Sequence, residues 1–528
     1  MTAAYAPPTW TTQNWAVTKP GAESQGGVVV CQNHDAAQAG IAVLNAGGNA
    51  ADAAVAAALV LATVEPWNCG LGGIGFAVIR HADGRAETLD FGPVAPAGLD
   101  PKLFPLTGRL KQDLFAWPEV VEDRNIHGPL SFVIPSSVAG YGLLHETYGQ
   151  LGHAEVFGPA VALARRGLPQ DWFTTLKIAN SAGSLRLYAE SARIYLPGGL
   201  PPIAPYQGTP GFLHQGRLAD TLERLRDAGW RDFYEGALAA DLVMDIRALG
   251  GVVSAADLAG CHATLRPATA ESWRGKGTLW LAGGLTAAPT LAKVMAGMAP
   301  VAPGRTPDGA WFTALSLALR AAYAERLKGL GAATDALEPA ETCTTHLTVM
   351  DKDGMSVAMT TTLLSSMGSR VVLPQTGVLM NNGVMWFDPE PGSPNHFRPG
   401  ARPLCNMLPA IFASEDGKLV VAAGASGGRR ILASVYQMLA FLLDFGMTPE
   451  QAGAQPRIDV SGPEGVTADR RLGAAILEAL AGAGPCEAVE HAVLPVNFAC
   501  PNAIVWDGKV RRGISDTMSP WSGAVGQG

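Results

Sequence analysis

The sequence has few features that point to a metal site or a disulfide framework. Its seven cysteines are odd in number and widely scattered, and no C-x-x-C brings two of them together. No H-E-x-x-H occurs, and the one H-x-E, His153-Ala154-Glu155, lacks the P-C-x-x-C of a zinc deaminase. We therefore expect free thiols, as in a reducing compartment, with no metal and no other cofactor.

Charge is also scarce, and so are long apolar runs. Only 16% of the residues are charged and the net charge is −8, which gives no electrostatic case for nucleic acid. Residues 1–20 contain neither the apolar nor the basic region of a signal peptide. The longest apolar run, 53–64, is too short to span a bilayer. These observations predict a cytoplasmic protein with no nucleic-acid or membrane partner.

Apolar residues and glycine are abundant instead. A hydrophobic content of 48% in 528 residues predicts a large, well-packed globule. Helical spacing dominates before residue 343, and alternation dominates after it, with strands expected at 345–351, 355–363, 377–381, 408–414 and 418–424. Helices and strands on both sides of this division are best satisfied by two packed sheets with helices outside.

The glycine run at 70–75 formally satisfies G-x-G-x-x-G. A dinucleotide fingerprint follows a strand and opens a helix. Here the run follows an Ala-rich helical stretch, 50–64, for which Asn49 is the expected cap, and it precedes an expected strand at 76–79. This context argues against nucleotide binding and favours close backbone packing.

Small hydroxyl residues open one strand, in the sequence Cys343-Thr344-Thr345-His346. Further on comes a glycine-rich loop that ends in Gly427-Gly428. An attacking oxygen and a nest of backbone N–H groups are what nucleophilic acyl chemistry requires. The alternative is a polar turn that opens a strand, and we expect His346 to be structural rather than a base.

Several further segments, taken together and in order, identify a family. The chain resembles the γ-glutamyltransferase-like members of the N-terminal-nucleophile (Ntn) hydrolases over nearly its whole length. The segments that carry the resemblance are 47–55, Glu65-Pro66 with 72–76, 344–346, 351–354, 379–382, 402–404 and 426–431. The resemblance implies an α+β fold, a four-layer αββα sandwich.

The resemblance also implies a precursor, or zymogen, that cuts itself between Cys343 and Thr344 by an N→O acyl shift. Residues 1–343 would form a helix-rich large subunit and residues 344–528 a small subunit. The two would remain together as a heterodimer, and a dimer of such heterodimers is left open. The new N-terminal threonine carries its own base, since an unperturbed α-amino group has a pKa of about 7.7–8.0.

Within the site, the resemblance assigns Thr344 as the nucleophile and Thr362 as the second threonine, which hydrogen-bonds the nucleophile. Gly427 and Gly428 match the pair whose N–H groups form the oxyanion hole. Losing one such donor typically lowers the rate by about 10²–10³.

The departures from the family concern the γ-glutamyl head group. Family positions that bind its carboxylate and ammonium are occupied here by Gly92, Leu364, Gly383, Trp386 and Cys405-Asn406. Residues 382–389 resemble instead the cytosolic branch that includes oxamate amidohydrolase, and oxamate has a carboxylate but no α-amino group. We expect substrate contacts from Asn382, Trp386, Asn406 and Arg430, with Arg429 and Arg370 as other candidate carboxylate partners.

Three alternatives stay open. The enzyme could be a γ-glutamyl hydrolase or transpeptidase (a glutathione hydrolase), or a cephalosporin or glutaryl acylase acting on a bulkier amide. From a different class, it could be an unprocessed, non-catalytic binding protein. Two fragments cut at 343/344 would favour the enzyme, whereas a persistent intact chain would favour the binding protein.

Overall fold

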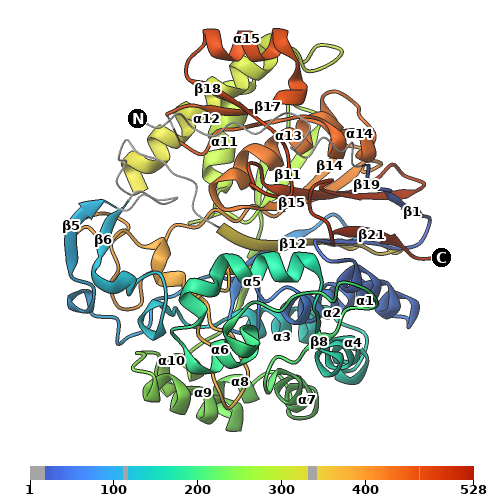
Figure 1. Ribbon diagram of the computed structural model, residues 1–528. Coiled ribbons are helices and arrows are strands. Elements are labelled where there is room, and N and C mark those ends of the chain that lie inside the picture. Colours follow the sequence, from blue (N-terminus) through green and yellow to red (C-terminus); the bar gives the residue numbers. More distant parts are fainter. Residues whose placement is uncertain (1–17, 111–116, 331–341, 463) are drawn as a thin grey trace.

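The computed structural model describes residues 18–110, 117–330, 342–462 and 464–528. Two sheets lie face to face in the middle of the molecule, with a layer of helices on each outer side (Figure 1). The expected four-layer αββα sandwich is therefore confirmed.

Each central sheet has seven strands, and every pair of neighbours within it is antiparallel. Sheet A has the spatial order β1 (Ala22–Ser24), β20 (Arg511–Ser515), β19 (Cys500–Trp506), β15 (Val420–Ser426), β14 (Ala410–Ser414), β11 (Gly277–Leu281), β10 (Thr269–Ser272). Sheet B has the order β21 (Gly523–Gly526), β2 (Val28–Cys31), β12 (Thr342–Met350), β13 (Ser356–Ser365), β3 (Ile74–Arg80), β4 (Ala86–Phe91), β9 (Thr264–Pro267).

The helices divide between the two outer layers (Figure 1). Beside sheet B lie α1 (His34–Asn45), α2 (Ala50–Val64), α3 (Ser137–Tyr148), α4 (His153–Arg166), α5 (Trp172–Leu185), α6 (Ala189–Tyr195), α7 (Leu218–Ala228), α8 (Asp232–Glu235), α9 (Ala237–Ala248) and α10 (Ala255–Ala259). Beside sheet A lie α11 (Ala288–Met298), α12 (Gly309–Leu330), α13 (Ile431–Leu443), α14 (Pro449–Ala454) and α15 (Ala474–Gly482). Small peripheral sheets are formed by β5 (Leu106–Leu110) with β6 (Pro118–Val120), β7 (Leu168–Pro169) with β8 (Phe212–Leu213), and β16 (Ile458–Asp459) with β17 (Val466–Asp469) and β18 (Cys486–Val489).

The alternation along single strands explains the layers. In β2, Val28 and Val30 belong to the core between the sheets, whereas Val29 and Cys31 belong to the core under the helices. Successive side chains of a strand point to opposite faces, so a strand that is apolar at every position must be covered on both sides. Sheet A is covered in the same way by a third core, which it shares with α11, α12 and α13.

Helix α2 is buried along its whole length. Its many alanines have small side chains, so neighbouring elements can pack closely against it. Helix α1 comes so near that a Cβ at Gly40 would lie 3.3 Å from the Ala53 carbonyl oxygen. Asn49 caps its N-terminus as expected, and Asp52 completes a capping box. The helix is thus a fixed element whose C-terminal end lies in the interior.

The expected strands near the central threonines are confirmed as β12, β13, β14 and β15. The prediction of a strand at 377–381 is wrong. This stretch forms only isolated bridges, which join Leu379 to Val372 and Met380 to Gly72. Its backbone is held instead by side chains, because the Asn381 amide bonds Gly72 O at 2.8 Å and Val133 O at 3.0 Å.

The glycine run at 70–75 packs against backbone, as predicted from its context. A Cβ at Gly72 would lie 2.4 Å from Leu379 O, and one at Gly73 would lie 2.7 Å from Thr362 O. A Cβ at Gly75 would lie 2.4 Å from Thr360 O. These glycines therefore allow β13 and the 379–381 stretch to approach the chain closely.

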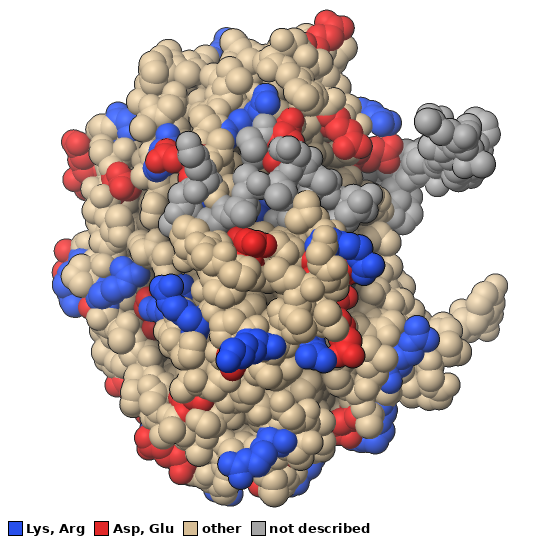
Figure 2. Space-filling view, turned by 90° about the vertical axis from the view of Figure 1, so that its left-hand side faces the viewer, with Lys and Arg blue, Asp and Glu red and all other residues tan. Residues whose placement is uncertain are grey.

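The surface carries both signs of charge. On the face shown in Figure 2, described Lys and Arg side chains are interspersed with Asp and Glu. Within the described residues, no helix combines the length and the hydropathy needed to cross a bilayer.

Candidate active site

The strand pair β12 and β13 is irregular at Thr344. The register changes from Cys343 opposite Leu364 to Thr345 opposite Thr361, so Thr344 faces two residues of β13, Thr362 and Leu363. Leu364 has φ 90°, a conformation that costs a non-glycine residue energy. Such a bulge re-aims side chains, and here it turns the Thr362 hydroxyl towards the chain between Cys343 and Thr344.

The Thr362 hydroxyl makes three hydrogen bonds. Thr362 Oγ1 accepts from Thr344 Oγ1 at 3.2 Å and from the Leu364 N–H at 2.8 Å. It donates its own proton to the Cys343 carbonyl oxygen at 2.7 Å. A hydroxyl has one proton, so both accepted bonds fix the direction in which it donates. The two threonines and the Cys343 carbonyl thus form one directed chain.

The turn after β15 brings Gly427 to the same place. Gly427 and Gly428 have φ of 132° and 62°, in the region that favours glycine. In the described chain, neither backbone N–H donates to another residue's backbone. Gly427 and Thr344 border a common cavity, whereas Gly428 does not line it. Donors in this position suit the oxygen of an acyl group attacked by Thr344.

His346 is fully buried between the two sheets. Its Nδ1 lies 2.8 Å from Thr360 Oγ1 and its Nε2 lies 3.2 Å from Thr348 Oγ1. Burial lowers the pKa of His346 to about 3, so the ring is neutral. Its ring also fills the space beside Gly424, where a Cβ would lie 2.1 Å from it. These contacts support the structural role expected of this histidine.

A cavity of about 270 Å³ lies along the free edge of β12. Strand β2 pairs with β12 only through 348–350, so no strand occupies that edge beside residues 344–347 in the described chain. Apolar side chains form much of the wall, among them Phe173 of α5 and Phe498, and Figure 1 shows α5 running alongside β12. The polar wall includes Gln32, Glu65, Asn68, Lys177 and Arg430. We call this space the β12-edge cavity.

Arg430 is the one of the four predicted substrate contacts that lines the β12-edge cavity. It is 8% exposed, and its guanidinium donates to the carbonyls of Val496 and Gly427, the latter at 3.4 Å. A cation held at the cavity wall is suitable for a carboxylate.

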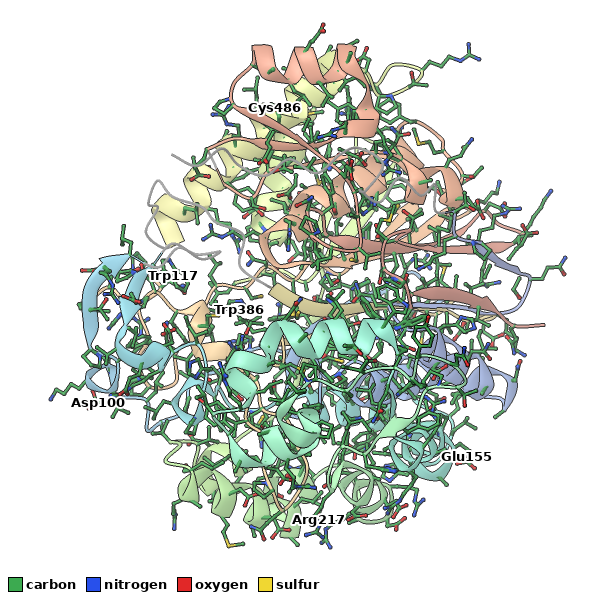
Figure 3. The ribbon with its side chains drawn as sticks, in the orientation of Figure 1. Asp100, Trp117, Glu155, Arg217, Trp386 and Cys486 are labelled. Atoms are coloured by element: carbon green, nitrogen blue, oxygen red, sulfur yellow. The ribbon has the colours of Figure 1, made fainter. Side chains whose placement is uncertain are left out.

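The other three predicted contacts lie elsewhere. Asn382 is fully buried, and its amide bonds Ser365 Oγ at 2.8 Å and Ile126 O at 2.7 Å. Asn406 Oδ1 accepts from buried Arg326 at 3.3 Å. Trp386, labelled in Figure 3, is packed in the core between the sheets. None of the three lines the β12-edge cavity, and their contact with substrate stays a prediction.

Gly92 leaves room for a different arginine. A Cβ at Gly92 would lie 2.6 Å from Arg402 Nη2, and Arg402 pairs with Asp90, with its Nη1 3.1 Å from Oδ2. In the related transpeptidases, by resemblance, an arginine at the position of Gly92 binds the substrate carboxylate. Here the guanidinium of Arg402 lies beside that position. Of the two other candidate arginines, neither Arg370 nor Arg429 lines the β12-edge cavity, and Arg370 donates to Ser365 Oγ at 2.8 Å and to Gly368 O at 2.5 Å.

Sequence reasoning did not find Gln32, Glu65, Asn68 and Lys177 as neighbours of Thr344. The one signal was Glu65-Pro66, a family segment to which no chemistry was assigned. Their proximity arises from packing. The C-terminal end of α2 and the side of α5 both lie next to β12, although the two helices are far from it in the sequence.

The chain is similar to known proteins over most of its length. The family profile described as Gamma-glutamyltranspeptidase matches residues 36–336 and 331–524. The glutathione hydrolase proenzyme of Pseudomonas sp. (strain A14) is 30% identical over 496 residues, which cover 83% of this chain and 81% of that protein. The acylase ACY 1 proenzyme of Pseudomonas sp. (strain SE83) is 31% identical over 481 residues, 84% of each chain.

The fold comparison points in the same direction. The crystal structure of a cephalosporin acylase from Bacillus halodurans superposes with a TM-score of 0.82 over 98% of both chains, at 22% identity. The profile covers both halves of the chain, and the relatives align over most of their own length. The chain therefore belongs to the gamma-glutamyltranspeptidase family, as an enzyme with the fold of the Ntn hydrolases.

Proposed function

We propose that this protein is a self-cleaving amidohydrolase whose nucleophile is Thr344, the N-terminal residue of the processed small subunit. The observation that carries the proposal is the hydrogen-bond chain from Thr344 Oγ1 through Thr362 Oγ1 to the Cys343 carbonyl oxygen. The names of two relatives, both called proenzymes, support processing.

Cleavage follows from this geometry. Thr344 Oγ attacks the carbonyl carbon of Cys343, and the Thr362 hydroxyl stabilises the charge that develops on the carbonyl oxygen. The C–N bond breaks, the nitrogen of Thr344 takes up a proton, and an ester joins Cys343 to Thr344 Oγ. Water then hydrolyses the ester, which leaves a carboxylate on Cys343 and a free α-amino group on Thr344.

Turnover of a substrate amide uses the same groups. The free α-amino group of Thr344 accepts the hydroxyl proton as Oγ attacks the amide carbonyl, and it returns a proton to the leaving amine. The N–H groups at Gly427 and Gly428 receive the oxyanion. Water then attacks the acyl-enzyme ester and releases the acid.

For the substrate, we propose a small amide that carries a carboxylate, such as oxamate. Support comes from the replaced γ-glutamyl contacts and from Arg430, whose guanidinium lines the β12-edge cavity beside Thr344. The assay is ammonia release from oxamate, with γ-glutamyl-p-nitroanilide as comparator. Activity on the latter alone would refute the oxamate proposal and favour a glutathione hydrolase.

A bulkier acyl amide is the second candidate. The cavity of about 270 Å³ is larger than oxamate needs, and its wall is largely apolar. The 31% identity to an acylase proenzyme also supports a bulkier acyl amide as the substrate. Glutaryl amides and a cephalosporin side-chain amide therefore belong in the same panel, where faster hydrolysis of these than of oxamate would favour an acylase.

Whether the purified chain is cut or intact tests the non-catalytic alternative. Denaturing gel electrophoresis with intact-mass measurement should show two fragments, 1–343 and 344–528. A single intact chain that survives long incubation would count against the enzyme and for a binding protein.

A further inference from the structure

Glu65 is a carboxyl group in a position where helix stability does not favour one. It is the C-cap residue of α2, and its side chain is 2% exposed. The C-terminal end of a helix carries partial negative charge, which disfavours a carboxylate. Burial imposes a further cost unless the charge is paired. The helix dipole and the cost of burial both disfavour a glutamate at this position, so neither explains its presence.

The partners of Glu65 are incomplete. Asn68 Nδ2 donates to Glu65 Oε2 at 3.1 Å, and in the described chain Glu65 forms no ion pair with a basic side chain. Thr345, the residue after the nucleophile, has a buried hydroxyl close enough to Glu65 to lower the pKa of its carboxyl group. Burial raises the pKa of Glu65 above its ordinary value, against the smaller effects of Asn68, Thr345 and Lys177.

The same carboxyl group faces the nucleophile strand. Glu65, Cys343 and Thr344 all line the β12-edge cavity, which runs along the edge of β12 that β2 leaves free. Cleavage before Thr344 creates one new cation on this strand, the α-ammonium group. We propose that Glu65 is the positioning counter-ion of the α-amino group of Thr344, an inference that rests on the proposed function.

The pairing sets the pH at which Thr344 is active. A carboxylate near an ammonium group stabilises the protonated amine, so Glu65 raises the pH at which the amine becomes a free base. Charged or titratable groups that also face this cavity are Lys177, Arg430, His491, Cys500, Asp516, and the thiol and new α-carboxylate of Cys343. The buried thiols of Cys31 and Cys69 also interact with Glu65. Lys177 and Arg430 act in the opposite direction to Glu65, because positive charge favours the neutral amine.

The test is the pH dependence of kcat/KM for the amide that the processed wild-type enzyme hydrolyses fastest. In Glu65→Gln, which keeps an acceptor for Asn68, the acidic limb should move down by about one pH unit. Glu146→Gln makes the same chemical change at an exposed position of α3 and should leave the limb in place. In parallel, the pH dependence of acetylation of the Thr344 α-amino group, followed by mass spectrometry, should shift by the same amount.

The outcomes are separable. An uncleaved wild-type chain overturns the proposed function itself. A processed Glu65→Gln enzyme whose limb and acetylation profile match those of wild type overturns the role of Glu65 alone. If Glu65→Gln does not fold or is not processed, Glu65→Asp decides: it keeps the charge but shortens the side chain by one methylene group, so both profiles should move down by a few tenths of a pH unit, and unmoved profiles contradict the pairing.

Discussion

Thr362 Oγ1 and the carbonyl oxygen of Cys343 lie 2.7 Å apart, and the hydroxyl donates to this oxygen of the peptide group that joins Cys343 to Thr344. The same hydroxyl accepts from Thr344. One side chain therefore contacts both the group that would attack and the group that would be attacked.

Thr344→Ala should remove both processing and activity, because alanine has no oxygen to attack the Cys343 carbonyl. Intact-mass measurement should show one chain of full length after prolonged incubation. Thr344→Ser keeps a hydroxyl and should still be cut, more slowly. Cleavage of Thr344→Ala at the same bond would contradict the assignment of the nucleophile.

Thr362→Val should slow cleavage by about 10²–10³, since it removes the donor to the scissile carbonyl. Valine keeps the shape of threonine, so the rate measures the hydroxyl. Thr361→Val is the matched control: the Thr361 hydroxyl bonds Tyr141 at 2.9 Å on the helix side. We expect this control to lose about 1–2 kcal/mol of stability and to be processed normally. Equal cleavage rates in the two variants would contradict the hydrogen-bond chain.

Gly427→Ala should lower kcat strongly while KM changes little. The residue has φ 132°, and a Cβ would lie 2.9 Å from Ala499 Cα, so the turn that carries the proposed oxyanion donors must shift. Gly446→Ala is the control, because Gly446 also has positive φ, 62°, but has open space around its Cβ position. We expect the control to lose about 1 kcal/mol of stability and to keep its kcat.

Arg430→Gln should raise KM for a carboxylate-bearing amide by about tenfold or more, and change KM for a neutral amide of similar size much less. The ratio between the two substrates separates loss of charge recognition from general damage to the turn. Arg429→Gln, at the neighbouring residue that does not line the cavity, should leave that ratio unchanged. A ratio unchanged in Arg430→Gln would exclude this arginine as the carboxylate partner.

Buried His346 should make the fold sensitive to acid. Its folded pKa of about 3 lies below the ordinary 6.5, so the unfolded chain binds a proton that the folded chain does not. The contribution of this site is fully present above about pH 6.5, and stability falls as the pH drops from there towards 3. Integrated over this window, the loss is on the order of 3–5 kcal/mol.

The measurement compares urea unfolding of wild type and His346→Gln between pH 7 and 4. The comparison is needed because burial raises the pKa of Asp459 to about 6, and this carboxyl stabilises the fold as the pH falls below 6. The advantage of wild type over the variant should shrink as the pH falls. A constant difference would mean that folding does not lower the pKa of His346.

Local chemistry explains which features could be predicted from the sequence. The cap at Asn49, the strands around Thr344 and the packing role of the glycines at 72, 73 and 75 follow from patterns within a few residues. The strand expected at 377–381 failed because Asn381 binds the backbone of Gly72 and Val133, which no local pattern shows. Glu65 and Lys177 were missed for the same reason, since folding alone brings them to Thr344.

The strand order has a consequence for reversibility. Sheet A contains β1, β10 and β11 from before residue 343 and β14, β15, β19 and β20 from after it, and sheet B is mixed in the same way. Fragments 1–343 and 344–528 would each hold only part of each central sheet, and each of the three cores draws side chains from both fragments, so neither fragment could complete a core alone. After cleavage, refolding from denaturant becomes a second-order reaction between two aggregation-prone chains. We therefore expect the uncut precursor to regain its structure on dilution and the cut enzyme to be held together kinetically.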